Sequence, residues 1–232
     1  MEEISRVLIK VSGEAMSNEE NLINSSDVRA VADNIVELLE NDIQVAVVVG
    51  GGNFWRGRSS SDMDRGVADE IGMLATVMNG LALSDMLTSL DVANVLVSSV
   101  NIDKVCRTYS ILETQNMLNE GKVVIFVGGT GAPYFSTDTA AVLRACEIHA
   151  DAVFCSKAID GIYDCDPKKY PDAIKYDTLD YDTIIRDNLS ALDLTATAMA
   201  REYKMPLYVY SKNEPHAILR IIEGEEIGTI VK

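Results

Sequence analysis

The chain has 232 residues and a formal net charge of −16 at pH 7, because 36 Asp and Glu residues outnumber 20 Lys and Arg residues. Apolar residue types make up 47% of the sequence, and only 15 residues are Gly and 5 are Pro. This composition is typical of a globular chain with a real core, and it excludes disordered, collagenous and disulfide-stapled small proteins. The acidic balance also argues against a nucleic-acid partner, since a negative field repels polyanions.

Cysteine usage and the N-terminal segment indicate a cytoplasmic protein. The 4 Cys residues form no CxxC pair and have no ligand-like spacing to the 2 His residues, so we expect reduced, mostly buried thiols. The N-terminus, MEEISRVLIKVSGEA, carries acids where a signal peptide needs basic residues. The longest weakly polar run, residues 70–85, contains Thr76, Asn79 and Ser84 and is too short to span a bilayer. We therefore expect no membrane partner.

Short apolar runs rich in β-branched residues alternate along the chain with helical patterns. The runs predict strands over 4–11, 45–49, 92–97, 123–127, 152–155 and 207–210. Apolar residues at three- and four-residue steps predict helices over 28–38, 73–87 and 141–148. Runs without alternation are typical of strands covered on both faces, so the sequence predicts an α/β fold with helices on both faces of a mostly parallel sheet. We treat residues 1–232 as one domain, with the polar stretch 160–182 as a surface loop or lobe.

Glycine-rich or small polar segments follow three of the predicted strands. They are Lys10-Val11-Ser12-Gly13-Glu14, Gly50-Gly51-Gly52-Asn53 and Gly128-Gly129-Thr130-Gly131. Ligands bind at the carboxyl ends of parallel strands, and glycine lets backbone N–H groups approach an oxyanion. One such cluster could equally be a tight turn, but three at equivalent positions favour a phosphate-rich ligand.

The usual nucleotide fingerprints are missing, since neither GxxxxGK[ST] nor a complete GxGxxG occurs. Lys10 could instead reach the β- and γ-phosphates of a nucleotide while the backbone of Ser12 and Gly13 holds their oxygens, although a strand-end lysine alone is usually a solvated charge. With 2 His residues and no nucleophile motif, Ser-His-Asp and Cys-His chemistry are not expected. A hard cation such as Mg²⁺, held by carboxylates and phosphates, is compatible with the composition.

Several motifs occur in the order of a known family. They are KVSGEA at 10–15, GGGN at 50–53 with Arg56-Gly57, GMLATVMN at 72–79, GTGAPYFSTD at 129–138, Asp160-Gly161 with Asp166-Pro167, and 192–201. Together they resemble the bacterial uridylate (UMP) kinases of the amino-acid kinase superfamily. GMLATVMN and the 130–138 run are specific to these kinases, whereas KxSGE and GGGN fit several members of the superfamily. The resemblance implies a three-layer α/β/α sandwich with a central mostly parallel sheet.

The resemblance also implies a reaction, the transfer of the γ-phosphoryl group of ATP to UMP to give UDP and ADP in pyrimidine and CTP biosynthesis. The nucleophile would be a phosphate oxygen that is already anionic, so no general base is required. Because the two nucleotides repel one another, cations must gather between them, and Lys10, Arg56 and the Mg²⁺ that accompanies ATP are the candidates. Bacterial members are homohexamers activated by GTP and inhibited by UTP, which the resemblance extends to this chain.

The residues matched to ATP binding lie in four parts of the chain. They are Lys10, Val11, Ser12, Gly13, Gly52, Arg56, Lys157, Tyr163 and Asp166. Tyr163 and Asp166 match residues around adenosine, and Lys157 stands where the family commonly has Thr. The residues matched to the reaction centre are Lys10, Arg56, Asp138 and Asp193. Asp138 would orient Lys10 or share Mg²⁺, whereas Asp193 could instead be an acid at a helix N-terminus.

The residues matched to UMP binding lie mostly in one loop. They are Gly51, Asp69, Thr130, Gly131, Ala132, Pro133, Tyr134, Phe135, Ser136 and Thr137. Asp69 could accept hydrogen bonds from the ribose hydroxyls, although an acid at a helix start is commonly a cap. Ala132 stands where the family commonly has Asn, so uracil selectivity would depend more on backbone groups. Ser136 replaces a usual Thr and keeps the hydroxyl.

Two other functions share part of this pattern. A phosphotransferase of the same superfamily with an acyl or carbamoyl acceptor would need the lysine and the glycine-rich segments, but not GMLATVMN or the 130–138 loop. A non-catalytic nucleotide-binding sensor could keep the fold, with Lys10, Arg56 and Asp138 dispensable. The apolar stripe over 72–87 is compatible with a core position or with a subunit contact.

Overall fold

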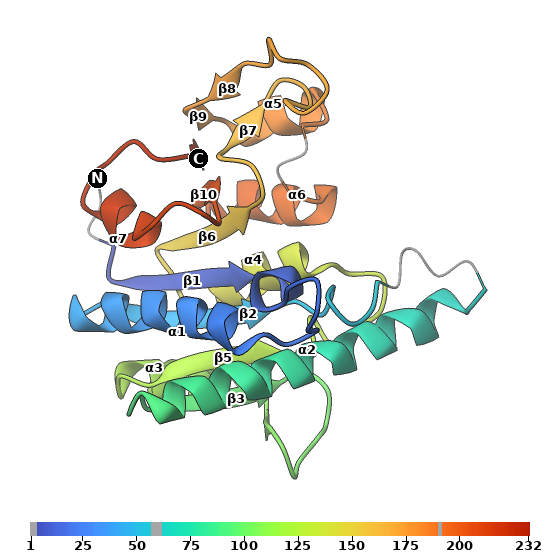
Figure 1. Ribbon diagram of the computed structural model, residues 1–232, viewed down its shortest axis with the longest axis vertical. Coiled ribbons are helices and arrows are strands. Elements are labelled where there is room, and N and C mark those ends of the chain that lie inside the picture. The colour runs from blue at the N-terminus through green and yellow to red at the C-terminus, as the bar shows by residue number, and fades with distance from the viewer. Residues whose placement is uncertain (1–3, 57–61, 190–191) are drawn as a thin grey trace.

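The computed structural model describes residues 4–56, 62–189 and 192–232. A nine-stranded sheet has the order β4-β3-β5-β2-β1-β6-β10-β11-β9 (Figure 1). Its strands are β1 (Arg6–Val11), β2 (Gln44–Val49), β3 (Asn94–Ser98), β4 (Arg107–Thr108), β5 (Val123–Val127), β6 (Ala152–Lys157), β9 (Thr178–Leu179), β10 (Leu207–Ser211) and β11 (Thr229–Val231). Neighbouring strands are parallel except for the antiparallel pair β10 and β11.

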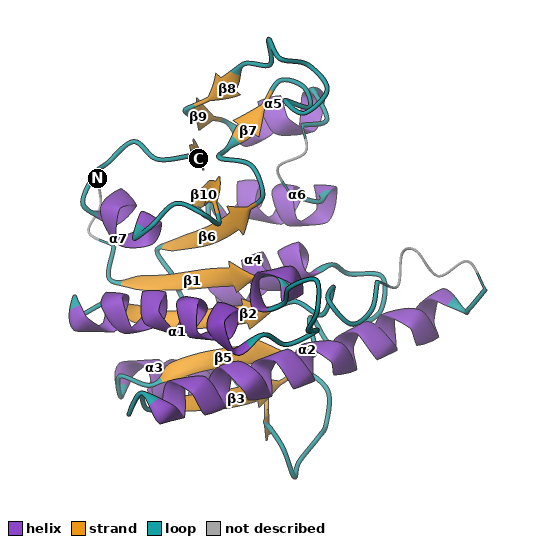
Figure 2. Cartoon of the chain, in the orientation of Figure 1, coloured by secondary structure: helices purple, strands orange, loops and turns teal. Residues whose placement is uncertain are grey.

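Helices cover both faces of the sheet, which confirms the predicted α/β class and the three-layer arrangement (Figure 2). Those on one face are α1 (Ser25–Glu40), α2 (Arg65–Ser89) and α7 (Ala217–Ile222). Those on the other are α3 (Ile111–Asn119), α4 (Thr137–Glu147), α5 (Tyr181–Arg186) and α6 (Leu194–Tyr203). A short 3₁₀ helix, η1 (Gly13–Met16), follows β1.

The alternation of side chains along β1 decides which helices its residues face. Val7 and Ile9 pack into the core beneath α1, α2 and α7, whereas Leu8 packs into the core beneath α3 to α6. Lys10 is two residues beyond Leu8, so its side chain points toward the α4 layer. The chain adds β2, β5 and β3 on one side of β1 and β6 and β10 on the other. The carboxyl end of β1 therefore lies at the topological switch point, where α/β sheets bind ligands.

Each predicted strand and helix is present, with differences at the boundaries and edges. α1 begins earlier than its apolar pattern, and its cap is Asn24, whose side chain accepts hydrogen bonds from the N–H groups of Ser26 and Asp27. The strands that the sequence missed in the main sheet are short and lie toward its edges: β4, β9 and β11. The 160–182 stretch contains β9 and a two-stranded hairpin of β7 (Ile162–Tyr163) and β8 (Lys175–Tyr176), beyond β10 in Figure 1.

Among the described residues, α2 is the one helix with the length and apolar composition of a membrane span, with a mean hydropathy of 1.3. Its 25 residues extend well beyond the 70–85 run considered in the sequence. The helix packs on the sheet, however, and buries Ala75, Leu83 and Leu87 together with the polar Asn79. This packing accounts for part of the apolar composition, since 39% of the apolar window is buried while Leu74, Met78 and Leu81 are exposed.

Gly80 sets how closely α2 can approach the sheet. A Cβ at Gly80 would overlap Val127 of β5 and lie 2.7 Å from Cδ1 of Leu96 in β3, whereas a Cβ at Gly72 in the same helix would meet no described atom within 4 Å.

We expect Gly80→Ala to lower the free energy of unfolding by about 1–3 kcal/mol, because overpacking outweighs the helix propensity of Ala. Gly72→Ala is the matched control and should raise it by up to about 1 kcal/mol. Urea denaturation of both variants checks the pair. Equal effects of the two substitutions would contradict this account of the α2 packing.

Candidate active site

An ion pair between a buried lysine and a partly buried aspartate lies at the carboxyl end of β1. The Nζ atom of Lys10 is 3.1 Å from Oδ1 of Asp138, which lies in the first turn of α4. Burial is the largest single influence and would lower the pKa of Lys10, but the charge and hydrogen bond of Asp138, together with smaller contributions from Cys155 and Glu14, outweigh it and the pKa is raised. Lys10 is therefore a fixed positive charge at neutral pH. The contact agrees with the expectation that Asp138 orients Lys10.

A cleft of about 350 Å³ opens beside this pair. Its lining includes these residues that the sequence singled out for a site: Gly51, Gly52, Arg56, Asp69, Thr130, Ala132, Phe135, Ser136, Thr137 and Asp138. They come from the loops after β2 and β5, the start of α2 and the start of α4. Gly131, Pro133 and Tyr134 belong to the same loop but are not part of the lining. The tertiary structure thus gathers most of the predicted UMP side into one concave surface.

Asp69 anchors the loop that borders this cleft. Its Oδ2 atom accepts hydrogen bonds of 2.8 Å from the backbone N–H of Tyr134 and from Nε of Arg65. The cap of α2 is Asp64, whose side chain accepts from the N–H of Val67, so the alternative in which Asp69 caps the helix is wrong. Tyr134 adopts a positive φ of 73°, a conformation that costs energy for a residue with a Cβ and that these contacts help to maintain.

The GMLATVMN motif connects two glycine-rich loops. Oγ1 of Thr76 accepts from the N–H of Gly128 at 2.7 Å, and Nδ2 of Asn79 donates to the carbonyl of Gly50 at 2.8 Å. Asn79 is fully buried and also exchanges hydrogen bonds with the side chain of Asn53. Since positions i and i+3 lie on one helix face, α2 fixes the loops after β2 and β5 relative to each other. The sequence marked this motif without revealing that role; two polar residues at this spacing in an apolar stripe were the signal.

Arg56 connects the loops after β1 and β2. Its Nη2 atom forms an ion pair with Glu14, which lies in η1, and its side chain is 65% exposed. Gly13 allows the loops after β1 and β2 to approach each other, because a Cβ at this position would overlap the side chain of Asn53. The lining also includes residues that were not predicted as site residues: Trp55, Arg65, Gly72, Met73, Thr76 and Gly129. The buried Nε1 of Trp55 has no hydrogen-bond partner among the described residues.

Asp193 caps α6, in agreement with the alternative that it is an acid at a helix N-terminus. Its Oδ1 atom accepts from the N–H groups of Thr195 and Ala196, and its Oδ2 atom accepts from the hydroxyl of Ser136. The hydroxyl of Thr139 in α4 also donates to Asp193. Asp193 therefore holds the start of α4, which carries Asp138, and a direct part in the reaction stays a prediction.

The residues matched to ATP are not gathered in one hollow. Tyr163 and Asp166 line a second cleft of about 340 Å³ in the 160–182 stretch, whereas Val11 lines a third between β1, β10, α1 and α7. The Tyr163 hydroxyl donates to Asp160 at 2.6 Å, and this hydrogen bond raises the pKa of Tyr163. Lys157 ends β6, where its carbonyl accepts from the N–H of Lys212.

Ser12 completes the ATP-side set. It precedes η1, and its carbonyl accepts a 3.0 Å hydrogen bond from the N–H of Ala15. This hydrogen bond closes a turn over residues 12–15, directly after the end of β1. Its role toward phosphate stays a prediction.

Carboxylates do not converge into a metal cluster in the described parts of the chain, where no three His, Cys, Asp or Glu side chains are placed to share an ion. Mg²⁺ keeps much of its shell as water and phosphate oxygens in nucleotide sites, with one or two carboxylates from the protein. A part for Asp138 in holding Mg²⁺ stays a prediction.

Known proteins resemble this chain over its whole length. The model of the amino acid kinase family matches residues 5–211. A uridylate kinase of Shewanella putrefaciens is 45% identical over 230 residues, which cover 98% of this chain and 94% of that protein. The UMP kinase structure from Bacillus anthracis superposes with a TM-score of 0.96 at 36% identity, covering 99% of this chain and 96% of its own. That from Ureaplasma parvum has a TM-score of 0.93 at 35% identity and covers 99% of both chains.

The Asp193 contacts predict a stability difference between two helix caps. Asp193→Ala should lower the free energy of unfolding by about 2–3 kcal/mol, because it removes the α6 cap and leaves the hydroxyls of Ser136 and Thr139 without their acceptor. Asp193→Asn keeps a capping oxygen and should retain most of the stability.

The control is Asp180→Ala, which removes the cap of α5 through the contact with Thr183. It should cost only about 1 kcal/mol, since the hydrogen bonds of the Asp180 side chain within the described structure go to Thr183 of the same helix. Thermal and urea unfolding measure all three variants. A similar loss in Asp180→Ala and Asp193→Ala would refute the special position of Asp193.

Proposed function

The chain belongs to the amino acid kinase family, and on that premise we propose that it is a UMP kinase, which transfers the γ-phosphoryl group of ATP to UMP and produces UDP and ADP. The observation that carries this proposal is the buried Lys10–Asp138 pair beside the 350 Å³ cleft. The pair lies at the switch point of the sheet and offers a fixed cation where an incoming phosphoryl group would be bound. The similarity to uridylate kinases over nearly the whole chain supports UMP as the phosphoryl acceptor.

The acceptor side supports a nucleoside monophosphate. The loop at 130–137 borders the cleft with backbone groups and the hydroxyls of Ser136 and Thr137, while Asp69 offers a carboxylate for ribose hydroxyls. Because Ala132 lacks a hydrogen-bonding side chain, selectivity for uracil would come from the backbone of this loop. The UMP phosphate would then face Arg56 and the glycine-rich turn of Gly51 and Gly52.

The donor side would bind ATP through the segment from Lys10 to Gly13. As the γ-phosphoryl group leaves ATP, charge spreads over its oxygens, and Lys10 stabilises it without any proton transfer. Mg²⁺ would neutralise part of the ATP charge, with Asp138 as its candidate protein ligand. Tyr163 and Asp166 would flank adenosine, which requires the 160–182 stretch to border the bound nucleotide.

Assembly and regulation belong to the same proposal. Exposed apolar side chains on α2, namely Leu74, Met78 and Leu81, suit a contact with a second copy, as in a homohexamer. Activation by GTP, inhibition by UTP, a cytoplasmic location and a place in CTP biosynthesis follow from the family resemblance. No membrane or nucleic-acid partner is expected for a chain with this charge.

The acceptor decides between UMP kinase and its alternatives. We expect a coupled ADP-release assay with UMP, CMP, dTMP and acetylglutamate side by side to give the highest kcat/KM with UMP, because the 130–137 loop and Asp69 suit a uridine ribose. Turnover of acetylglutamate without UMP would favour the acyl-acceptor alternative. Nucleotide binding with no turnover of any acceptor would favour the sensor.

Replacing Lys10 tests the catalytic cation. Lys10→Met should lower kcat at least about a hundredfold, as for the loss of a group that stabilises transition-state charge, with little change in UMP affinity. Lys122→Met is the control, because Lys122 precedes β5 at the opposite edge of the sheet and pairs with Glu120. It should keep wild-type turnover. A wild-type kcat in Lys10→Met would remove Lys10 from the reaction.

A further inference from the structure

A buried arginine lies behind the loop that borders the acceptor cleft, at a position that the proposed reaction does not use. Arg144 lies in the second half of α4 and is 3% exposed. Its Nη1 atom donates to Glu147 at 2.5 Å, and its guanidinium carbon lies 3.9 Å from the ring centre of Tyr109. Burying a guanidinium is costly unless it is paired, so these contacts explain how the fold tolerates the charge but not why it is there.

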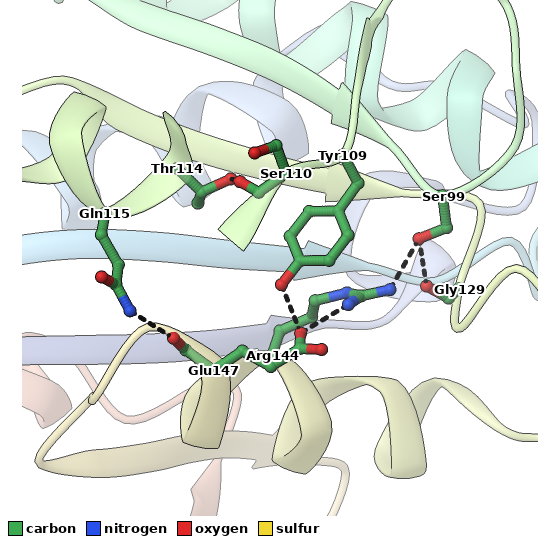
Figure 3. A network of polar contacts seen from close by, with 8 residues as sticks. All are labelled: Ser99, Tyr109, Ser110, Thr114, Gln115, Gly129, Arg144 and Glu147. Atoms are coloured by element: carbon green, nitrogen blue, oxygen red, sulfur yellow. Dashed lines mark hydrogen bonds and ion pairs between the residues drawn. The ribbon is translucent and has the colours of Figure 1, made fainter. Parts of the chain in front are cut away.

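The other arm of the guanidinium leads to the cleft. Nη2 of Arg144 donates to Oγ of Ser99 at 2.9 Å, and Oγ of Ser99 in turn donates to the carbonyl of Gly129 at 2.9 Å (Figure 3). Arginine cannot accept a hydrogen bond, so the Ser99 hydroxyl accepts from Arg144 and its own hydrogen is left to donate to Gly129. The positive charge also polarises that hydroxyl and strengthens its bond to the loop.

Gly129 belongs to a turn that needs support. Gly128, Gly129 and Gly131 all have positive φ, and the turn closes with a 3.0 Å hydrogen bond from the N–H of Gly131 to the carbonyl of Gly128. Glycine can leave such a conformation easily, because its backbone is permissive. Thr76 holds the turn at Gly128 from α2, and Ser99 holds it at Gly129. The next residue, Thr130, lines the cleft.

We propose that Arg144 is a positioning residue, which acts through Ser99 to hold the Gly128–Gly131 turn in the conformation that binds the UMP acceptor. The same helix carries Asp138, the partner of Lys10, about 9 Å from Arg144 along its axis. α4 thereby sets the acceptor loop and the phosphoryl-binding lysine relative to each other. The proposal rests on the proposed UMP kinase function for its substrate.

The network offers a matched pair of substitutions. Ser99→Ala removes the hydroxyl between Arg144 and the loop. Tyr109→Phe removes the hydroxyl that donates to Glu147 at 2.5 Å, at the end of the network away from the loop, and keeps the ring beneath the guanidinium. Both variants lose one partly buried hydroxyl of the same network, so both should lose some thermal stability.

We expect Ser99→Ala to raise KM for UMP about tenfold with less than about a twofold change in KM for ATP, the effect of losing one charge-assisted contact. Tyr109→Phe should keep the wild-type KM for both. Arg144→Lys should resemble Ser99→Ala, because one ammonium lacks the fork that serves Glu147 and Ser99 together. Hydrogen exchange on the protein without nucleotide should show faster exchange at 128–131 in Ser99→Ala but not in Tyr109→Phe.

A wild-type KM for UMP in Ser99→Ala would overturn the proposal, as would an equal rise in Tyr109→Phe, which would show a general loss of stability instead. If the wild-type protein does not phosphorylate UMP, the proposed function fails. The exchange comparison uses no substrate and, with Arg144→Lys included, then decides the role of Arg144 by itself: faster exchange at 128–131 in Ser99→Ala and Arg144→Lys but not in Tyr109→Phe supports the positioning of the turn, and unchanged exchange in either of the first two refutes it.

Discussion

The buried contact between Lys10 and Asp138 is the interaction on which the site depends. An ammonium group taken from water needs a partner, and Asp138 provides one at 3.1 Å from the first turn of α4. The helix N-terminus stabilises the carboxylate in turn. The result is a positive charge already held in place, which is what the proposed stabilisation of a transferring phosphoryl group would require.

Other basic side chains around the cleft are also paired with a carboxylate. Arg56 pairs with Glu14, and Arg65 pairs with Asp69, just as Lys10 pairs with Asp138. In a chain with a net charge of −16, unpaired acids close to the cleft would repel nucleotides. Pairing neutralises them locally and holds each basic side chain in place. Phosphate binding would then require these cations to share their partners with the substrate, which is easiest for the exposed Arg56.

Two helices organise the loops between them. α2 holds the loops after β2 and β5 through Thr76 and Asn79, and α4 carries Asp138 and Arg144. Thr76, Asn79 and Arg144 are buried and Asp138 is partly buried, so losing the hydrogen bonds that they make would be destabilising. These contacts restrict the loops to one arrangement, so the precision of the site comes from packed helices rather than from the glycine-rich segments themselves.

The sequence by itself determined the six strands at the centre of the sheet, the α/β class and the glycine-rich strand ends, because apolar runs without alternation and glycine punctuation are local signals. Its motifs also indicated Lys10, Asp138 and the 130–137 loop. The short edge strands depended on pairing with neighbours, so they left little trace in the chain. Only the tertiary structure decided that Asp64 rather than Asp69 caps α2, that Asp193 joins α4 to α6, and that Arg144 reaches the acceptor loop through Ser99. Each of these contacts forms between side chains whose distance is set by how helices pack on the sheet, and residue spacing along the chain does not contain that distance.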